Sequence, residues 1–270
     1  MSSIGRMLAA ASATALLAAV GLSAIACDEL LSGESITGSG EVVQETYALA
    51  DFTNVDVGHA FDAEIARADE FSVAVTVDDN ILENVDVRLD GDTLRIDMKG
   101  NDSYRNVTMD AAITMPALGH LKLSGASTAT LGAFSSSEPL KVELEGASRV
   151  DCSDMTSESA VFDLEGASRA DCRDVTTGET EVALQGASSL SLTGRGGHAD
   201  ISGKGASAAE LGGFQVSSAR VKLEGASNAS VNTDGALDVD LAGSSDVTYT
   251  GEPTLGDVKM SGDSTLERGG

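Results

Sequence analysis

A five-residue motif that recurs about every twenty residues constrains the fold of this chain more than any other feature of its sequence. Its clearest form, Leu-Glu-Gly-Ala-Ser, occupies residues 144–148, 164–168 and 223–227. Related forms repeat the glycine with steps of 21, 20, 20, 19, 20, 18 and 19 residues, at Gly125, Gly146, Gly166, Gly186, Gly205, Gly225, Gly243 and Gly262. A fixed glycine at such a period is typical of a solenoid in which each repeat forms one turn.

The residues on both sides of each glycine alternate between apolar and polar, as in a half-buried β-strand. Val142 and Leu144 precede Gly146 by four and two residues, and Val150 and Cys152 follow it by four and six. The other repeats keep this alternation, and the i, i+3, i+4 spacing of a helix is missing from them. We therefore predict an all-β fold, a parallel β-helix of about eight rungs with about 20 residues per rung, in which Gly-Ala-Ser forms a corner.

Stacked rungs would place the serine of each corner in one column, with about 4.8 Å between neighbours. The column consists of Ser127, Ser148, Ser168, Ser188, Ser207, Ser227, Ser245 and Ser264. Eight equivalent hydroxyls do not make one reactive nucleophile. We expect them to satisfy backbone groups at the corner and one another.

Two cysteines occupy equivalent positions in consecutive repeats. Cys152 and Cys172 each lie six residues after a repeat glycine, so they should stack one rung apart on the inward side. A Cα separation of about 4.8 Å would permit a disulfide in an exported protein. The pair would serve equally well as small apolar side chains in the core.

The same register stacks like charges on the outer surface, with Asp151 over Asp171. A Ca²⁺ ion could relieve the repulsion, because it prefers oxygen ligands. Arg149 and Arg169 stack nearby and could neutralise the same acids without a metal. Arg173 beside these acids is the one arrangement that would suit a polysaccharide lyase, since such enzymes combine Ca²⁺ with a basic residue.

Composition argues against several classes of function. The formal net charge is −26, which excludes nucleic acid as a partner. Tryptophan is absent and aromatic residues make up 3% of the chain, which removes the usual stacking platforms for sugars. His59, His120 and His198 are isolated and have no metal-binding spacing. We therefore predict a protein without a catalytic site, a cofactor or a metal.

The N-terminal residues indicate export. Residues 1–26 combine Arg6 with an apolar run from residue 7 onward and read as a signal peptide. Ala24-Ile25-Ala26-Cys27 is typical of a bacterial lipoprotein, in which Cys27 would be lipidated. Ordinary cleavage at the same alanines and a retained membrane anchor are alternatives. Residues 27–40 are rich in Ser, Gly and acids, and we predict a flexible tether there.

Residues 41–118 precede the repeats and should form a β-rich cap at one end of the β-helix, which then occupies residues 119–270. We predict cap strands at 52–57, 62–66, 71–77, 85–89, 93–98 and 111–115. Asp90-Gly91-Asp92 indicates a hairpin turn, and residues 79–84 should form a helical turn or a loop.

Several of these segments resemble one bacterial family. They are Asp-Phe-Thr-Asn-Val at 51–55, Phe-Asp-Ala-Glu-Ile at 61–65, Phe-Ser-Val at 71–73, Thr-Leu-Arg-Ile at 93–96 and Tyr-Thr-Gly-Glu-Pro at 249–253. In this order, and with the glycine repeats between them, they resemble the auto-transporter adhesins with a head GIN domain, over nearly all of residues 41–265. The Gly-Ala-Ser corner departs from the Gly-Ser-Gly that is common in that family. The resemblance implies a right-handed β-helix on the cell envelope, an adhesive role and no catalytic residues.

Together these features predict a non-enzymatic lipoprotein of the bacterial envelope, periplasmic or surface-exposed, held to a membrane by a lipid on Cys27. It would act as an adhesin or surface scaffold toward an unidentified envelope or extracellular ligand. A polysaccharide lyase or hydrolase and a sensory or regulatory domain of the envelope are the alternatives.

Overall fold

The structure is a computed structural model and describes residues 33–269. The predicted signal peptide, the lipidation site Cys27 and the first part of the predicted tether lie outside these residues. In the part of the chain that the structure describes, no helix is long and apolar enough to cross a membrane.

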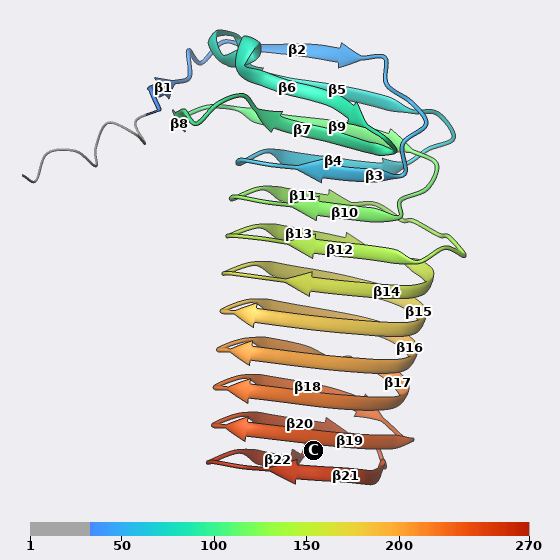
Figure 1. The fold of residues 1–270 in the computed structure, drawn as a ribbon. Coiled ribbons are helices and arrows are strands. Elements are labelled where there is room, and N and C mark those ends of the chain that lie inside the picture. The colour runs from blue at the N-terminus through green and yellow to red at the C-terminus, as the bar shows by residue number, and fades with distance from the viewer. Residues whose placement is uncertain (1–32, 270) are drawn as a thin grey trace, which may run out of the picture.

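The repeats wind into a tall stack of parallel strands (Figure 1). Strands that end at a corner glycine form what we call the pre-corner face: β10 (His120–Leu123), β12 (Leu140–Leu144), β14 (Thr156–Leu164), β19 (Ala236–Gly243) and β21 (Thr254–Met260). Strands that begin after a corner form the post-corner face: β11 (Thr128–Leu131), β13 (Arg149–Ser153), β18 (Asn228–Thr233), β20 (Asp246–Thr250) and β22 (Thr265–Arg268). Three long strands begin on the post-corner face and end on the pre-corner face of the next turn: β15 (Arg169–Gly186), β16 (Ser189–Gly205) and β17 (Ala208–Gly225).

The register between neighbouring turns follows the repeat. Gly186 of β15 is opposite Gly205 of β16, which is opposite Gly225 of β17. This confirms the predicted solenoid with about 20 residues per turn. Its right-handedness stays a prediction.

The corners require glycine for two reasons. Gly166 has a φ of 84°, a left-handed conformation that is strained for other residues. A Cβ atom added at Gly166 would also lie 2.5 Å from the carbonyl oxygen of Gly146 in the preceding turn. The turns are this close because the amide of Ala167 donates a hydrogen bond to that same carbonyl, at 2.7 Å.

The core is a set of columns inside the stack. The predicted inward positions of the internal turns are buried, among them Leu121, Val142, Phe162, Val182 and Val221. Each turn buries its apolar side chains against the turns on either side, and a buried Val or Leu contributes about 1.5–3 kcal/mol. Stability is therefore distributed along the stack.

The parallel stack also includes part of the N-terminal region. β3 (Asn54–Val57) and β4 (Asp62–Arg67) pair in parallel with β10 and β11. β7 (Thr93–Met98) and β9 (Met109–Met115) pair in parallel with the other edges of β3 and β4. The stack thus extends beyond the start near residue 119 that the glycine motif predicts, and the order of turns differs from their order in the chain. The motif missed this turn because His59, with a φ of 59°, occupies the corner in place of glycine.

Antiparallel strands close this end of the stack. β2 (Val42–Tyr47) pairs with β5 (Ser72–Asp78), which pairs with β9, and β6 (Val85–Asp90) forms the predicted hairpin with β7. Residues 79–84, predicted as a helical turn or a loop, form the 3₁₀ helix η1 (Asp79–Asn84). Figure 1 shows these elements as a lid over the turn made by β7 and β9.

Part of the predicted tether is bound to this cap. β1 (Ser35–Thr37) pairs in parallel with β8 (Ser103–Arg105). The carboxylate of Asp78, which is 1% exposed, accepts hydrogen bonds of 2.6 Å from the backbone amides of Gly40 and Thr108. Residues 33–40 have few apolar side chains to bury, and polar contacts hold them instead. This corrects the prediction that the flexible segment extends to residue 40.

Candidate binding surfaces

The pre-corner face carries a charged cluster whose members neutralise one another. Nζ of Lys122 lies 2.7 Å from Oε1 of Glu143 and 2.7 Å from Oε1 of Glu145, and Nζ of Lys141 lies 2.6 Å from Oε2 of Glu143. The hydrogen bonds from Lys122 and then Lys141 lower the pKa of Glu143 to about 2. These groups already satisfy one another, which leaves little free charge here to recruit a ligand.

The post-corner face carries the predicted pair of stacked acids. Asp151 is opposite Asp171. Nη2 of Arg149 lies 2.7 Å from Oδ1 of Asp151 and 2.7 Å from Oδ2 of Asp171, while Nε of Arg169 lies 2.8 Å from Oδ2 of Asp171. The hydrogen bond from Arg169 is the main reason that the pKa of Asp171 is lowered.

The repulsion between Asp151 and Asp171 could be relieved by a Ca²⁺ ion or by arginine, and the structure contains the arginine contacts. Arg173, the basic residue of the lyase alternative, is exposed at the end of this cluster and lies opposite Ser153. Within residues 33–269, no three side chains of His, Cys, Asp or Glu gather closely enough to hold a metal ion.

The two cysteines lie where the repeat predicts. Cys152 of β13 is opposite Cys172 of β15, with Cα atoms 4.5 Å apart and the sulfurs at bonding distance. Both side chains are buried in the column six residues after the corner. The position suits a disulfide, and it takes no part in an accessible site.

The corner serines bond to the backbone, as predicted. The hydroxyl of Ser168 donates to the carbonyl of Glu165 at 2.8 Å, and the hydroxyl of Ser207 donates to that of Ser227 at 3.1 Å. The corner serines from Ser127 to Ser245 have buried side chains. The column is therefore part of the corner and not of a surface.

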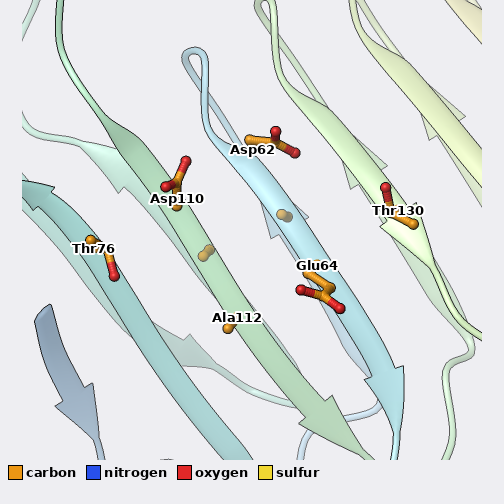
Figure 2. A pocket seen from close by; sticks show the side chains of 8 residues that line it. Asp62, Glu64, Thr76, Asp110, Ala112 and Thr130 are labelled. Atoms are coloured by element: carbon orange, nitrogen blue, oxygen red, sulfur yellow. The ribbon is translucent and has the colours of Figure 1, made fainter.

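A shallow hollow of about 380 Å³ lies on the outside of the post-corner face near the cap (Figure 2). β4 supplies Asp62 and Glu64, β9 supplies Asp110 and Ala112, and the neighbouring strands supply Thr76 and Thr130. Burial, and then the charge of Asp62, raise the pKa of Asp110. The lining contains three acids and no basic residue, so this hollow suits a neutral or positively charged group.

A second hollow, of about 510 Å³, lies farther along the same face, over β16, β17, β18 and β20. Glu210 and the backbone of two adjacent glycines form part of its polar lining. The rest consists of short polar side chains, those of Ser191, Thr193, Asn228, Ser230, Asp246 and Thr248. Gly212 and Gly213 of β17 have no side chains, which leaves space on this face between β16 and β18. Hydroxyl and amide groups here can both donate and accept hydrogen bonds.

The sequence reading missed both hollows. The sequence does contain a sign of them, because Ala112 and Gly212-Gly213 occupy outward positions where other turns have longer polar residues. Recognising it required knowing which residues of different turns lie side by side. For β4, β9 and β5 that depended on the non-sequential order of the cap.

An elongated β-solenoid with polar outer faces and an antiparallel cap over its N-terminal end defines the class of this protein. Residues 51–253 match the family described as "Putative auto-transporter adhesin, head GIN domain", and the chain belongs to that family. This confirms the resemblance seen in the N-terminal and closing motifs.

Solved structures of three bacterial proteins share the fold. A "putative lipid binding protein" from Parabacteroides distasonis aligns with a TM-score of 0.80 at 14% identity, over 88% of this chain and 100% of its own. A "putative adhesin" from Parabacteroides merdae aligns with a TM-score of 0.77 at 17% identity, over 88% and 100%. Another "putative adhesin", from Bacteroides fragilis, gives 0.65 at 17% identity, over 86% and 99%. A comparison with curated proteins found no match.

Proposed function

We propose that this protein is a non-enzymatic lipoprotein of the bacterial envelope that acts as an adhesin or surface scaffold, with the post-corner face as its binding surface. The observation that carries the proposal is the row of short polar side chains along this face, which includes the two hollows. Membership of a family of adhesins supports it. Its localisation rests on the predicted signal peptide and on Cys27.

The chemistry of this face favours a neutral or cationic polymer as the ligand. Ser, Thr and Asn side chains lose little rotamer freedom when they are ordered by a partner. Without aromatic platforms each contact is weak, so useful affinity requires many contacts along the stack at once. A formal charge of −26 opposes the binding of anionic polymers. A neutral polysaccharide of the envelope or its surroundings meets these requirements.

The proposed anchor fits the direction of the stack. Cys27 precedes β1, which pairs with β8 beside the cap, so a lipid on Cys27 would hold the capped end near the membrane. The turns that follow would then extend away from it. A diacylglyceryl group binds a bilayer stably, because each buried CH₂ contributes about 0.8 kcal/mol.

Adhesion is tested with the full-length chain on the surface of an expressing bacterium. We expect Ser191→Arg with Ser230→Arg, which fill the second hollow, to reduce retention of cells on immobilised neutral polysaccharide by about tenfold, a loss of about 1.4 kcal/mol. Ala183→Arg with Ala242→Arg is the matched control, because it adds the same charge to outward positions of the pre-corner face. Equal retention by both pairs would contradict the assignment of the binding face.

Anchoring is tested separately by mass spectrometry of the mature N-terminus. We expect a chain that begins with diacylglyceryl-modified Cys27 and that Cys27→Ala releases from the membrane fraction. An unmodified mature N-terminus, or an uncleaved chain that begins at Met1, would contradict lipidation.

A further inference from the structure

The C-terminal end of the stack exposes side chains that every internal turn buries. Leu255, Val258 and Met260 of β21 are 44%, 41% and 44% exposed. Their counterparts in the preceding turn, Leu237, Val239 and Leu241, are 0%, 2% and 1% exposed. Figure 1 shows β21 and β22 as the last turn, and within residues 33–269 no strand pairs with their outer edges.

The backbone of β21 is also open to pairing on this side. The amide of Ser261 donates to the carbonyl of Leu241 on β19 at 2.9 Å, which directs this residue toward the stack. Peptide groups alternate in direction along a strand, so those of Val258 and Met260 point to the free edge. An exposed edge strand with apolar neighbours is a template for another strand. The opposite end of the stack is closed by its antiparallel cap.

We propose that this end binds a second copy of the same chain, with the two β21 strands antiparallel about a two-fold axis through Val258. In that register the two Val258 residues exchange backbone hydrogen bonds. Met260 then lies across from Gly256 of the second copy, where β21 is irregular and no side chain obstructs it. The apolar columns of the two stacks become continuous, which buries the side chains that one copy leaves exposed.

The charges on the rim select this register. Asp257 and Lys259 lie on the same outer surface of β21, where both line a hollow beside Asp238 and Asp240. An axis through Val258 places Asp257 of one copy directly opposite Lys259 of the other, twice in the interface. An axis through Asp257 would instead place the two copies of Asp257 opposite each other, and an axis through Lys259 would do the same for lysine. Like charges in directly opposite positions are unfavourable.

The biological role of this interface rests on the proposed function, because it requires the lipid anchor at the capped end. If a lipid on Cys27 holds the capped end, tail-to-tail pairing joins two chains whose anchors lie at opposite ends of the dimer. Such a dimer fits chains on two facing envelopes and makes the protein a self-adhesin. The dimer itself does not depend on the anchor.

The test exploits the reciprocity of the charge pair. We expect the purified mature chain to sediment as a dimer at 0.15 M salt. Asp257→Lys should oppose lysine to lysine and Lys259→Asp should oppose aspartate to aspartate, so each variant alone should raise the dissociation constant at least about tenfold. Mixing the two variants should restore a dimer, because each then supplies the charge that the other lacks. The double variant should dimerise like the original chain.

Val258→Pro gives an independent test. The Val258 amide points to the free edge, so proline there removes no hydrogen bond within the chain but blocks strand pairing. We expect a folded monomer by circular dichroism and sedimentation.

A monomeric original chain, or a dimer that neither single charge variant weakens, would overturn the proposal. Failure of the mixed variants to associate would overturn the two-fold register. Binding of polysaccharide by the post-corner face is measured with other variants, so either proposal can fail without the other.

Discussion

The corner glycines are the residues on which the whole stack depends. Each one combines a left-handed backbone with a carbonyl of the previous turn in the place where a Cβ would stand, as at Gly166. The repeat made these glycines recognisable in the sequence, because glycine is the residue that meets both demands. His59, which adopts the same backbone conformation at the corner of β3 and β4, shows why sequence alone could not find every corner.

We expect Gly166→Ala to lower the free energy of unfolding by about 1–3 kcal/mol, because it adds backbone strain and a clash. Gly132→Ala is the control, since a Cβ there would meet its nearest atom at 3.7 Å, an ordinary contact. Urea unfolding followed by circular dichroism measures both. Equal stability of the two variants would contradict the close packing of the corners.

Asp78 is a residue whose importance the sequence did not reveal, because an aspartate at the end of a strand is usually solvated. Backbone hydrogen bonds from Thr108 and Gly40 lower its pKa. A lowered pKa means that Asp78 stabilises the fold above the unfolded value of about 3.9 and that this contribution is lost as the pH falls through the folded-state value.

We therefore expect Asp78→Asn to be less stable than the original chain at pH 7, because an amide cannot accept both hydrogen bonds equally well. The difference should shrink as the pH is lowered from 7 toward 3, because below about 3.9 the carboxyl group of Asp78 binds a proton more readily in the unfolded chain than in the folded one. Urea midpoints at the two pH values measure this. A difference that does not change with pH would show that the charge of Asp78 is not what holds residues 33–40 to the cap.

At the scale of strands, the repeats were predictable and the cap was not. The alternation around each glycine specified the strands of β12 and β13, and the constant spacing specified their register. In the cap, β3 lies between β7 and β10, although the chain reaches β7 after β3 and before β10. Pairing that skips sequence order depends on long-range packing, which local patterns do not contain. β1, β2 and β8 were missed for the same reason.

Covalent bonding between β13 and β15 is a prediction that belongs to this scale. We expect Cys152 and Cys172 to be bonded in the exported protein, with an intact mass about 2 Da below that of the fully reduced chain. The bond closes a loop with a sequence separation of 20, so Cys152→Ala with Cys172→Ala should cost about 2–4 kcal/mol of stability under oxidising conditions.

Reduction of the original chain separates the bond from the packing of the sulfur atoms. It should remove most of the stability difference without changing the β-sheet spectrum. Two thiols that react with iodoacetamide in the unfolded, unreduced protein would contradict the disulfide and leave the apolar pair as the explanation.

At the scale of the whole molecule, the fold depends on turns that lie directly over one another. A solenoid of this kind has two ends, and each must be closed or occupied. Among residues 33–269, β2 and β5 close the N-terminal end, while no strand covers β21 at the C-terminal end. The sequence predicted the cap at one end of the stack. Which side chains the open edge exposes, and how they complement a second copy, required the register of the last turn.

The most direct test of the stack is the distance between two spin labels, attached to cysteines that replace Thr130 and Thr248 in a chain without its native cysteines. These exposed residues lie in one outward column, six turns apart through Asp151, Asp171, Ser191, Glu210 and Ser230. Stacking at about 4.8 Å per turn predicts a single narrow distribution near 29 Å between the backbones, measured with excess unlabelled chain to suppress contacts between copies. A broad distribution, or a mean distance far from this value, would contradict the stacking of residues twenty places apart.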